Sequence, residues 1–452
     1  MQFPTLALLL KLTFAIIKAS LREIYVPTKE VISAQWLIAE KVIAVSVSLI
    51  TTTLVARYLA PELFGRLSYL TSIAMLLSPV ISLGLNGIVI RELVDRRADT
   101  GKILGTAFAL RLGMGCIVFM ISWGVISHFR LDEISGQLLF LIGASVFDAS
   151  MVFDSWLQSR VLNRQAALCR LLALLLATLA RIYGVYWGLG LDWFVWTQAG
   201  QWLLVSLLLT TVYLTQRDRA HSIVIDNVEG KHLMKSGVML MVSGVAAMIY
   251  LKIDQIMIGN ILGDTEVGYY SIAVRLSELW YFVPQAIVMS FFPRILELRR
   301  KSEREYESFL QNLSNTLLIL ALIIAVIVSL YGDYAVMLLF GSSYMPSSGV
   351  LVIHIWGSLI IFHRVLLSRW LIAENLLGLS MMTQVAGAAI NIVMNAIFIP
   401  KYGITGAAYT TLVSYFFSTY LVLYLSPKGM MIRSIFMRSF MLPVRCIKSR
   451  FS

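Results

Sequence analysis

Cysteine and histidine are scarce in this sequence, and neither is spaced like a set of metal ligands. The three cysteines, Cys116, Cys169 and Cys446, lie far apart and form no CxxC pair. They therefore indicate neither a disulfide framework nor a zinc site. The five histidines form no ligand pattern either. We expect no structural metal and no organic cofactor.

Charge is also sparse. Only 14% of the 452 residues are charged, whereas 58% are hydrophobic and the mean hydropathy is +0.80. So much apolar surface cannot be hidden in one water-soluble core, which predicts an all-α polytopic membrane protein. The net charge of +12 invites a nucleic-acid interpretation. The cations gather on one side of the predicted spans, however, so we expect no nucleic-acid partner.

The hydrophobic segments predict about twelve transmembrane helices. Each has about the 20 residues or more that a hydrocarbon layer of about 30 Å requires. We place them at 33–57, 65–90, 103–127, 136–158, 166–188, 193–214, 234–260, 268–293, 310–331, 347–373, 377–399 and 404–426. The apolar run Phe3–Leu10 is too short to cross the membrane and lacks the flanks of a signal peptide. We expect residues 1–32 to form a cytoplasmic, interfacial segment.

An offset of 203 positions relates two parts of the chain. It places Leu59, Gly65 and Ser68 on Leu262, Gly268 and Ser271, and Pro79 two positions from Pro284. Proline is common in membrane helices, so the prolines alone would be weak evidence. Together these matches predict an N-lobe at 33–214, a cytoplasmic linker at 215–233, a C-lobe at 234–426 and a basic cytoplasmic tail at 427–452.

The loops carry their positive charges on one side. With the N-terminus inside, 28 lysines and arginines fall on the inner side, among them Arg170, Arg364 and Arg369. Four fall on the outer side, at Arg57, Arg66, Arg130 and Lys401. Cytoplasmic loops are enriched in Lys and Arg, so this split predicts that both termini are cytoplasmic and that the number of spans is even.

Five further cations lie inside the predicted spans: Lys41, Arg111, Arg181, Lys252 and Arg275. A charge at the bilayer centre costs about 3 kcal/mol, so such residues normally face a bundle interior or a wet cavity. Lys41 and Arg181 lie close enough to a span end for the side chain to reach the interface, which is the alternative for them. For the other three we predict a place in a cavity.

Four acids accompany these cations: Asp148 and Asp154 in the fourth span, Asp254 in the seventh and Glu278 in the eighth. Glu278 lies one turn from Arg275, and a simple neutralising ion pair is the alternative to a functional role. Asp148 has no cation in its own span. It is the best candidate for a protonatable or sodium-binding carboxylate, unless an interhelical partner such as Arg111 holds it.

Polar residues also recur in the eleventh span, where Asn391 and Asn395 lie one turn apart after Gln384. Such a polar face is more often an interhelical hydrogen-bonding surface than a ligand site.

Three blocks carry a family resemblance. ARYLAPELFGRLSYLTSIAMLLSPVISLGLNGIVIREL (Ala56 to Leu93) resembles the first-to-second-span block of the polysaccharide transporter family, in the MOP (multidrug, oligosaccharidyl-lipid and polysaccharide) exporter superfamily. Asp254 to Pro284 and Ile399 to Ser414 resemble its seventh-to-eighth and eleventh-to-twelfth-span blocks. The resemblance covers residues 30 to 426 and is strongest to Wzx-type O-antigen flippases. Ala60 departs from the family, because glycine is usual there.

The resemblance implies two pseudo-symmetric six-helix bundles around a central cavity, as in MATE and other MOP proteins, working by alternating access. The cargo would be an undecaprenyl-diphosphate-linked oligosaccharide. It would be carried from the cytoplasmic to the periplasmic face of the bacterial inner membrane for O-antigen or other surface polysaccharide synthesis. Further partners would be membrane lipids and the polymerase and chain-length regulator of the same pathway.

A diphosphate is costly to move through hydrocarbon, and a cationic cavity lowers that barrier. The cargo contacts would come from the intramembrane cations, Arg111, Lys252, Arg275, Lys41 and Arg181. Coupling to a proton or sodium gradient would come from the acids, Asp148, Asp154, Asp254 and Glu278.

Two other functional classes stay open. A MATE-like drug/cation antiporter would favour acids over bases in its cavity, whereas here five intramembrane bases face four acids. A membrane-bound polysaccharide polymerase would need catalytic residues on a sizeable outer loop, and the predicted outer loops are short. We therefore expect a transporter and no enzymatic activity.

Overall fold

The computed structural model describes residues 29–96, 99–129, 135–216 and 224–441, and every regular element in these ranges is a helix. Most of the predicted interfacial segment 1–32 and the end of the predicted tail lie outside the described residues. The predicted all-α fold is confirmed. Below, the inner and outer ends are those that the charge pattern predicts to face the cytoplasm and the outside.

The first half contains the helices that end at Gln216. They are α2 (Lys29–Ser82), α3 (Leu85–Asp95), α4 (Thr100–Phe129), α5 (Ser135–Ser145), η2 (Val146–Ser150), α6 (Met151–Ser159), α7 (Asn163–Tyr186) and α8 (Leu191–Gln216). The predicted fourth span is thus two α-helices joined by the 3-10 turn η2. This turn places Asp148 at a break in the helix rather than on a continuous face.

The second half begins earlier than predicted. Its helices are α9 (Asn227–Leu262), α10 (Asp264–Glu278), η3 (Leu279–Tyr281), α11 (Phe282–Lys301), α12 (Glu303–Phe340), η4 (Ser342–Tyr344), α13 (Pro346–His354), α14 (Gly357–Ala373), α15 (Leu377–Thr419), η5 (Leu421–Leu425), η6 (Pro427–Gly429) and α16 (Met430–Phe440). Part of the predicted linker 215–233 is therefore the start of α9, and part of the predicted tail is the helix α16.

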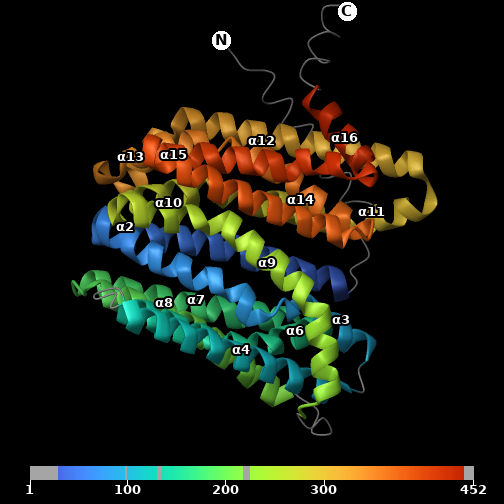
Figure 1. Cartoon of the computed structure of the whole chain (residues 1–452), viewed down its shortest axis with the longest axis horizontal. Helices are drawn as coiled ribbons and strands as arrows, with labels where there is room; N and C mark the ends of the chain where they lie inside the picture. Colours follow the sequence, from blue (N-terminus) through green and yellow to red (C-terminus); the bar gives the residue numbers. More distant parts are fainter. Residues whose placement is uncertain (1–28, 97–98, 130–134, 217–223, 442–452) are drawn as a thin grey trace, which may run out of the picture.

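Two of these helices are too long to be single spans. A straight helix of 54 residues such as α2 would be about 80 Å long, far more than the bilayer. The backbone breaks at Ala60 in α2 (φ 56°, ψ 173°) and at Gly403 in α15 (φ 61°, ψ −146°). In Figure 1 the chain of α2, drawn in blue, turns back at its break. Each long helix thus contains two passes.

The helix order is consistent with twelve spans. By length and composition alone, eight described helices are apolar enough to cross a membrane, or nine if the bent pair α13 and α14 counts as one. The breaks in α2 and α15 divide two of these eight. The 26-residue helix α8 supplies another candidate that hydropathy alone does not select.

The outer turns share one backbone conformation. Ala60, Gly263, Gly341 and Gly403 all have positive φ with an extended ψ. This region of φ and ψ is essentially restricted to glycine, because a Cβ crowds the backbone there. Ala60 and Gly263 are 203 positions apart, as the repeat predicts. The glycine that the resemblance leads us to expect at position 60 would fit this geometry, and Ala60 adopts the same conformation under strain.

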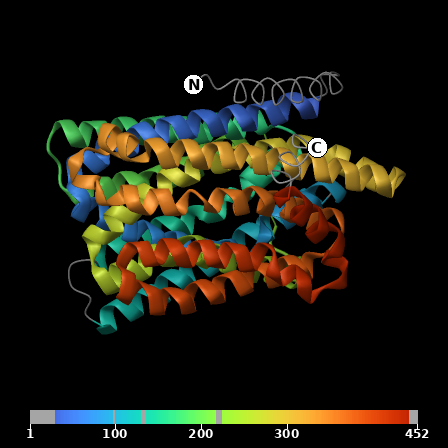
Figure 2. The ribbon, with the colours of Figure 1, turned by 90° about the horizontal axis from the view of Figure 1, so that it is seen from above.

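The two halves form separate layers. In Figure 1, α4 and α6–α8 lie on one side, α11–α16 lie on the other, and α2, α9 and α10 lie between them. Viewed from above in Figure 2, the long helices run roughly along one direction. This arrangement leaves α2 and α10 to line the space between the halves.

The halves are closed together at the outer end. A Cβ on Gly65 would lie 1.7 Å from the Asp264 carbonyl oxygen, and one on Gly268 would lie 2.1 Å from that of Pro61. Arg57 Nε donates to the Leu339 carbonyl at 2.8 Å. At the inner end, the Arg96 guanidinium instead binds Glu229, in the first turn of α9, with nitrogen–oxygen distances of 2.9 and 2.7 Å. The halves also approach closely at the inner end, where a Cβ on Gly84 would lie 2.8 Å from the Gly237 carbonyl oxygen, so close contacts join them at both ends.

Candidate functional site

A cavity of about 230 Å³ lies between α2, α7, α8 and α10. It contains two of the five predicted intramembrane cations, Arg181 from α7 and Arg275 from α10. Its other polar groups are neutral: the hydroxyls of Ser48, Thr51, Thr52 and Thr71 and the amides of Gln198 and Gln201. No carboxylate is among the lining residues described. The described lining of this central cavity therefore has two cations and no acid.

Arg275 is held by contacts that leave its charge intact. Its Nη1 donates to Thr52 Oγ1 at 2.9 Å, and its guanidinium lies 5.8 Å from the centre of the Phe64 ring. Glu278 is one turn away, yet no ion pair within 4 Å joins it to Arg275 in the described structure. Glu278 still acts on Arg275 electrostatically, without direct contact between the two side chains. Residues Val274 and Leu276 on either side are buried, whereas Arg275 is exposed to the cavity.

Arg181 also points into the cavity. Its Nη2 donates to Gln198 Oε1 at 2.8 Å and to Gln201 Oε1 at 3.0 Å. These contacts favour the cavity over the alternative that this side chain reaches the interface. Amide oxygens orient a guanidinium but do not neutralise it, so Arg181 keeps its charge available to a ligand.

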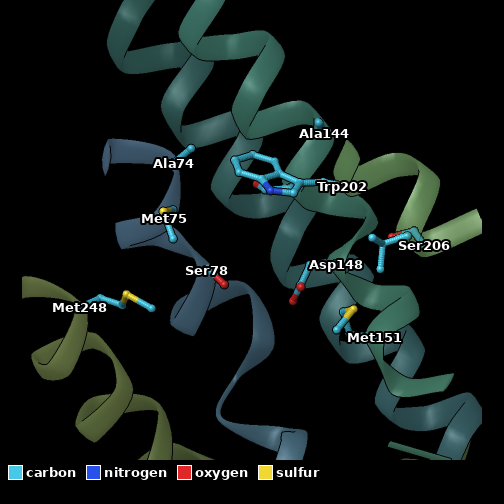
Figure 3. A pocket seen from close by; sticks show the side chains of 11 residues that line it. Ala74, Met75, Ser78, Ala144, Asp148, Met151, Trp202, Ser206 and Met248 are labelled. Atoms are coloured by element: carbon cyan, nitrogen blue, oxygen red, sulfur yellow. The ribbon is translucent and has the colours of Figure 1, made fainter. Parts of the chain in front are cut away.

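Arg111 lies elsewhere, in the interior of the first half. Only 1% of it is exposed, and its Nη2 contacts Asn86 Oδ1 at 2.8 Å and Asp148 Oδ2 at 3.2 Å. The predicted cavity role is not supported for Arg111, whereas the alternative that it holds Asp148 is what the structure contains. The carboxylate of Asp148 borders a neighbouring pocket of about 250 Å³, which shares Met75 with the central cavity, and Asp148 and Ser78 point toward the same space (Figure 3).

Neither predicted lysine lines the central cavity. Lys41 lies exposed on the surface of α2, and Lys252 is half-buried on α9. A position that faces the membrane or its interface fits Lys41, which is the alternative given for this residue above.

Asp154 belongs to an ion-pair network near the inner end. Arg170 Nη1 lies 2.7 Å from Asp154 Oδ1, and Arg170 Nη2 lies 2.7 Å from Glu40 Oε2. One arginine thus ties three helices, α2, α6 and α7, together. Arg170 was counted as a loop cation from the sequence, but it packs inside the inner end. Asp154 therefore has a structural partner and is a poor candidate for a coupling carboxylate.

Asp254 has no such cation. It is 3% exposed and accepts hydrogen bonds from Tyr270 Oη, Thr411 Oγ1 and Asn395 Nδ2, each at 2.6 Å. Asn395 in turn bonds Asn391 Oδ1 at 3.1 Å. The polar face expected on the eleventh span is confirmed as an interhelical hydrogen-bonding surface, and it encloses a carboxylate. In the sequence, this site is indicated by an acid in the seventh span and two asparagines one turn apart in the eleventh.

One buried cation was missed. Arg364 was counted with the inner loops, although it fell within the predicted tenth span 347–373. In the structure it is 7% exposed in α14, and its Nη1 and Nη2 donate to the Ser418 carbonyl at 3.0 Å and to Thr383 Oγ1 at 2.9 Å. No carboxylate pairs with it within 4 Å in the described ranges. The C-lobe therefore holds one isolated buried base and one isolated buried acid.

The model of a protein family described as "Polysaccharide biosynthesis protein" matches residues 54–349 of this chain. A putative O-antigen transporter of Shigella flexneri is 22% identical over 378 residues, covering 78% of this chain and 87% of that protein. A probable low-salt glycan biosynthesis flippase of Haloferax volcanii, Agl15, is 28% identical over 181 residues. That match spans 40% of this chain and only 38% of the archaeal protein.

Two solved structures share the fold at the same TM-score of 0.71 and 14% identity. One is the lipid II flippase MurJ in an inward closed conformation, with 92% of this chain and 93% of MurJ covered. The other is an inward-facing multidrug resistance MATE transporter of the MOP superfamily, with 87% and 95% covered. The fold is therefore that of the MOP exporters. Because the family match extends over well more than half of the sequence, this chain belongs to the polysaccharide biosynthesis protein family.

Proposed function

We propose that this protein is a flippase that moves a lipid-linked oligosaccharide, joined to its lipid through a diphosphate, from the inner to the outer face of the membrane. The observation that carries the proposal is the pair of arginines, Arg181 and Arg275, that face one cavity without a neutralising carboxylate. Transfer of an unpaired anion into an apolar medium is very unfavourable. Two guanidinium groups in a sheltered cavity lower that cost, and their fork geometry suits phosphate oxygens.

The neutral polar lining suits the saccharide. Hydroxyls such as Thr52 and Thr71 and the amides Gln198 and Gln201 can exchange hydrogen bonds with sugar hydroxyls. The names of the two relatives, an O-antigen transporter and a glycan biosynthesis flippase, agree with a glycan cargo. The fold alone does not choose, since a lipid II flippase and a multidrug transporter share it equally. The positive cavity favours an anionic cargo over a drug cation.

Contacts between the halves at both ends suit an alternating-access cycle, in which one end opens while the other stays closed. In the observed state the Gly65 and Gly268 contact holds the halves together at the outer end, and Arg96 and Glu229 join them at the inner end. Cargo entry from the inner side would therefore require the inner contact to open first. Opening the outer end would separate α2 from α10 and carry Arg275 away from Thr52, which weakens the grip on the diphosphate. We place the protein in the bacterial inner membrane with both termini in the cytoplasm.

Asp254 is the acid that we propose for coupling to a proton or sodium ion. Asp148 and Asp154 are each held by an arginine, whereas Asp254 is surrounded by hydroxyl and amide groups. The carboxylate and the hydroxyl oxygens of Tyr270 and Thr411 are the kind of ligand that hard cations prefer. Binding of a proton or a monovalent cation would neutralise the buried charge and remove its unfavourable solvation term.

The test is the membrane face on which cargo accumulates in cells that lack this protein. We expect completed lipid-linked units to collect on the inner face, and the plasmid-borne protein to clear them. Arg181→Ala and Arg275→Ala should abolish clearance at normal membrane levels, whereas Lys41→Ala, a cation outside the cavity, should not. Unchanged clearance in both arginine variants would remove the central cavity from the proposal. Units that reach the outer face unpolymerised without the protein would indicate a polymerase instead.

A further inference from the structure

A second pocket lies at the outer end of the first half, on a different side of α2 and α8 from the central cavity. Its volume is about 670 Å³, and its walls come from α2, α5 and α8. We call it the outer pocket and define it by six residues: Leu63, Arg66, Gln137, Phe140, Asp192 and Trp196. Pockets of this size commonly hold small organic ligands.

The three helices contribute to the outer pocket in the same way. Each presents one polar and one apolar or aromatic side chain about one turn apart: Arg66 with Leu63, Gln137 with Phe140, and Asp192 with Trp196. Gln137 Nε2 donates to Asp192 Oδ1 at 2.5 Å, which orients the two polar groups on neighbouring helices. Phe140 and Trp196 remain 45% and 55% exposed. The pocket thus offers two aromatic faces beside a fixed polar rim.

This combination suits a saccharide. A pyranose ring has an apolar face of C–H groups, which an aromatic ring covers, and a rim of hydroxyls, which planar polar side chains bond. The outer pocket contains one acid, one base and one amide, so it has no excess charge. The central cavity, in contrast, has two bases and no acid among its described lining residues. The outer pocket therefore fits the neutral sugar rather than the diphosphate.

Its position next to the central cavity matters for transport. On α2, Phe64 and Leu67 line the central cavity, and their chain neighbours Leu63 and Arg66 line the outer pocket. On α8, Gln198 and Gln201 face inward just beyond Trp196. Between these positions on α2, Gly65 forms part of the outer closure. A saccharide that leaves the cavity when this closure opens would pass the rim of the outer pocket.

We infer that the outer pocket is a saccharide-binding site that receives the glycan of the cargo on the outer face, an inference that rests on the proposed flippase function. Interfacial aromatics are common, and Trp187 at the same end is 62% exposed without lining this pocket. Trp196 differs because a hydrogen-bonded acid and amide stand beside it in a concavity. Trp187 is consequently the matched control.

The experiment is photo-crosslinking in cells that make the cargo from a radiolabelled sugar. Benzoylphenylalanine replaces Phe140, Trp196, Trp187 or, inside the central cavity, Thr71. We expect sugar-labelled adducts from positions 140, 196 and 71 and only background from 187. Adding Asp192→Asn should lower the adduct at 140 by about tenfold or more, the loss expected for one hydrogen bond to a charged group. Asp333→Asn, an exposed acid on α12, should leave the yield unchanged.

The outcomes separate this inference from the flippase proposal. Labelling at 71 with none at 140 and 196 would overturn the outer saccharide site and leave the flippase proposal standing. Equal labelling at 187 and 196 would overturn it as well, because contact would then be non-specific. No labelling at any position, with each variant at normal membrane levels, would contradict both. An adduct at 140 that is insensitive to Asp192→Asn would remove the polar rim from the site.

Discussion

The two halves of this protein treat buried charge differently. In the described part of the first half the buried acids Glu40, Glu92 and Asp154 each meet an arginine, and the half-buried Asp148 meets Arg111. In the second half Asp254 and Arg364 have only neutral hydrogen-bond partners. A paired charge inside a membrane protein is explained by packing alone, whereas an isolated one is costly and is usually retained for function. Asp254 in the C-lobe is therefore the candidate for ion coupling. Arg181 and Arg275 also lack a carboxylate partner among the described residues, and they lie in the cavity that we propose for the cargo.

Breaking the network of the first half should have the largest effect on stability. Arg170→Met would leave Glu40 and Asp154 buried without their cation, and removal of one partner of a buried ion pair typically costs about 3–5 kcal/mol. Unfolding of the purified protein by heat or denaturant measures this loss. Arg91→Ala is the control, because Arg91 is 59% exposed where it pairs with Glu92 and should cost less than about 1 kcal/mol. Equal losses of stability in Arg170→Met and Arg91→Ala would contradict the difference that we expect between a buried and an exposed ion pair.

The outer turn that recurs at Ala60 and Gly263 allows the two halves to be compared in backbone strain. Gly263→Ala would place a Cβ in a region of φ and ψ that costs about 1–3 kcal/mol, so the protein should unfold more easily. Ala60→Gly, at the equivalent position, should relieve such strain, with a gain of about 1 kcal/mol after the added flexibility of the unfolded chain is subtracted. Opposite signs are expected in paired unfolding measurements. A loss in both variants would mean that Ala60 is not strained.

Asp254→Asn should separate stability from coupling. The amide keeps the shape and removes the isolated charge, so the free energy of unfolding should change by less than about 1.5 kcal/mol. Cargo clearance should at the same time lose its dependence on the proton or sodium gradient. Asp154→Asn is the matched change in the first half and should leave that dependence intact. Gradient dependence that survives in Asp254→Asn would exclude this acid from coupling.

The smallest effect is expected where the halves join. Asp226 caps α9, its Oδ1 accepts from the backbone N–H groups of Val228 and Glu229, and these bonds lower the pKa of Asp226 below its usual 3.8. A lowered pKa means that the stabilisation is complete above pH 3.8 and is lost as the pH falls through the lowered value. Asp226→Ala should therefore lower stability slightly at pH 7 and flatten its decline in acid. A decline in acid as steep as that of the unmodified protein would show that the cap contributes nothing.

Particular residues show how far sequence patterns reach. Arg275 and Arg181 were identified because a charge inside an apolar span needs a cavity or a partner. Arg111 met the same criterion, yet it has a different role, because it faces Asp148 across the interior of the first half. Arg364 was misplaced because it was counted with the inner loops although it lies inside the predicted tenth span 347–373. The outer pocket was not anticipated, since its six residues come from three separate helices.

The sequence by itself determined that the chain is helical, spans a membrane repeatedly and consists of two related halves. Hydrophobic length and periodic repetition are local properties, so they can be read without knowing any contact. Only the tertiary structure decided which charges meet, because the partner of a buried residue depends on how each helix is rotated and broken. The turn η2 aims Asp148 at Arg111, and the contact between Gly65 and Gly268 holds α10 against α2, beside the cavity that Arg275 shares with Arg181.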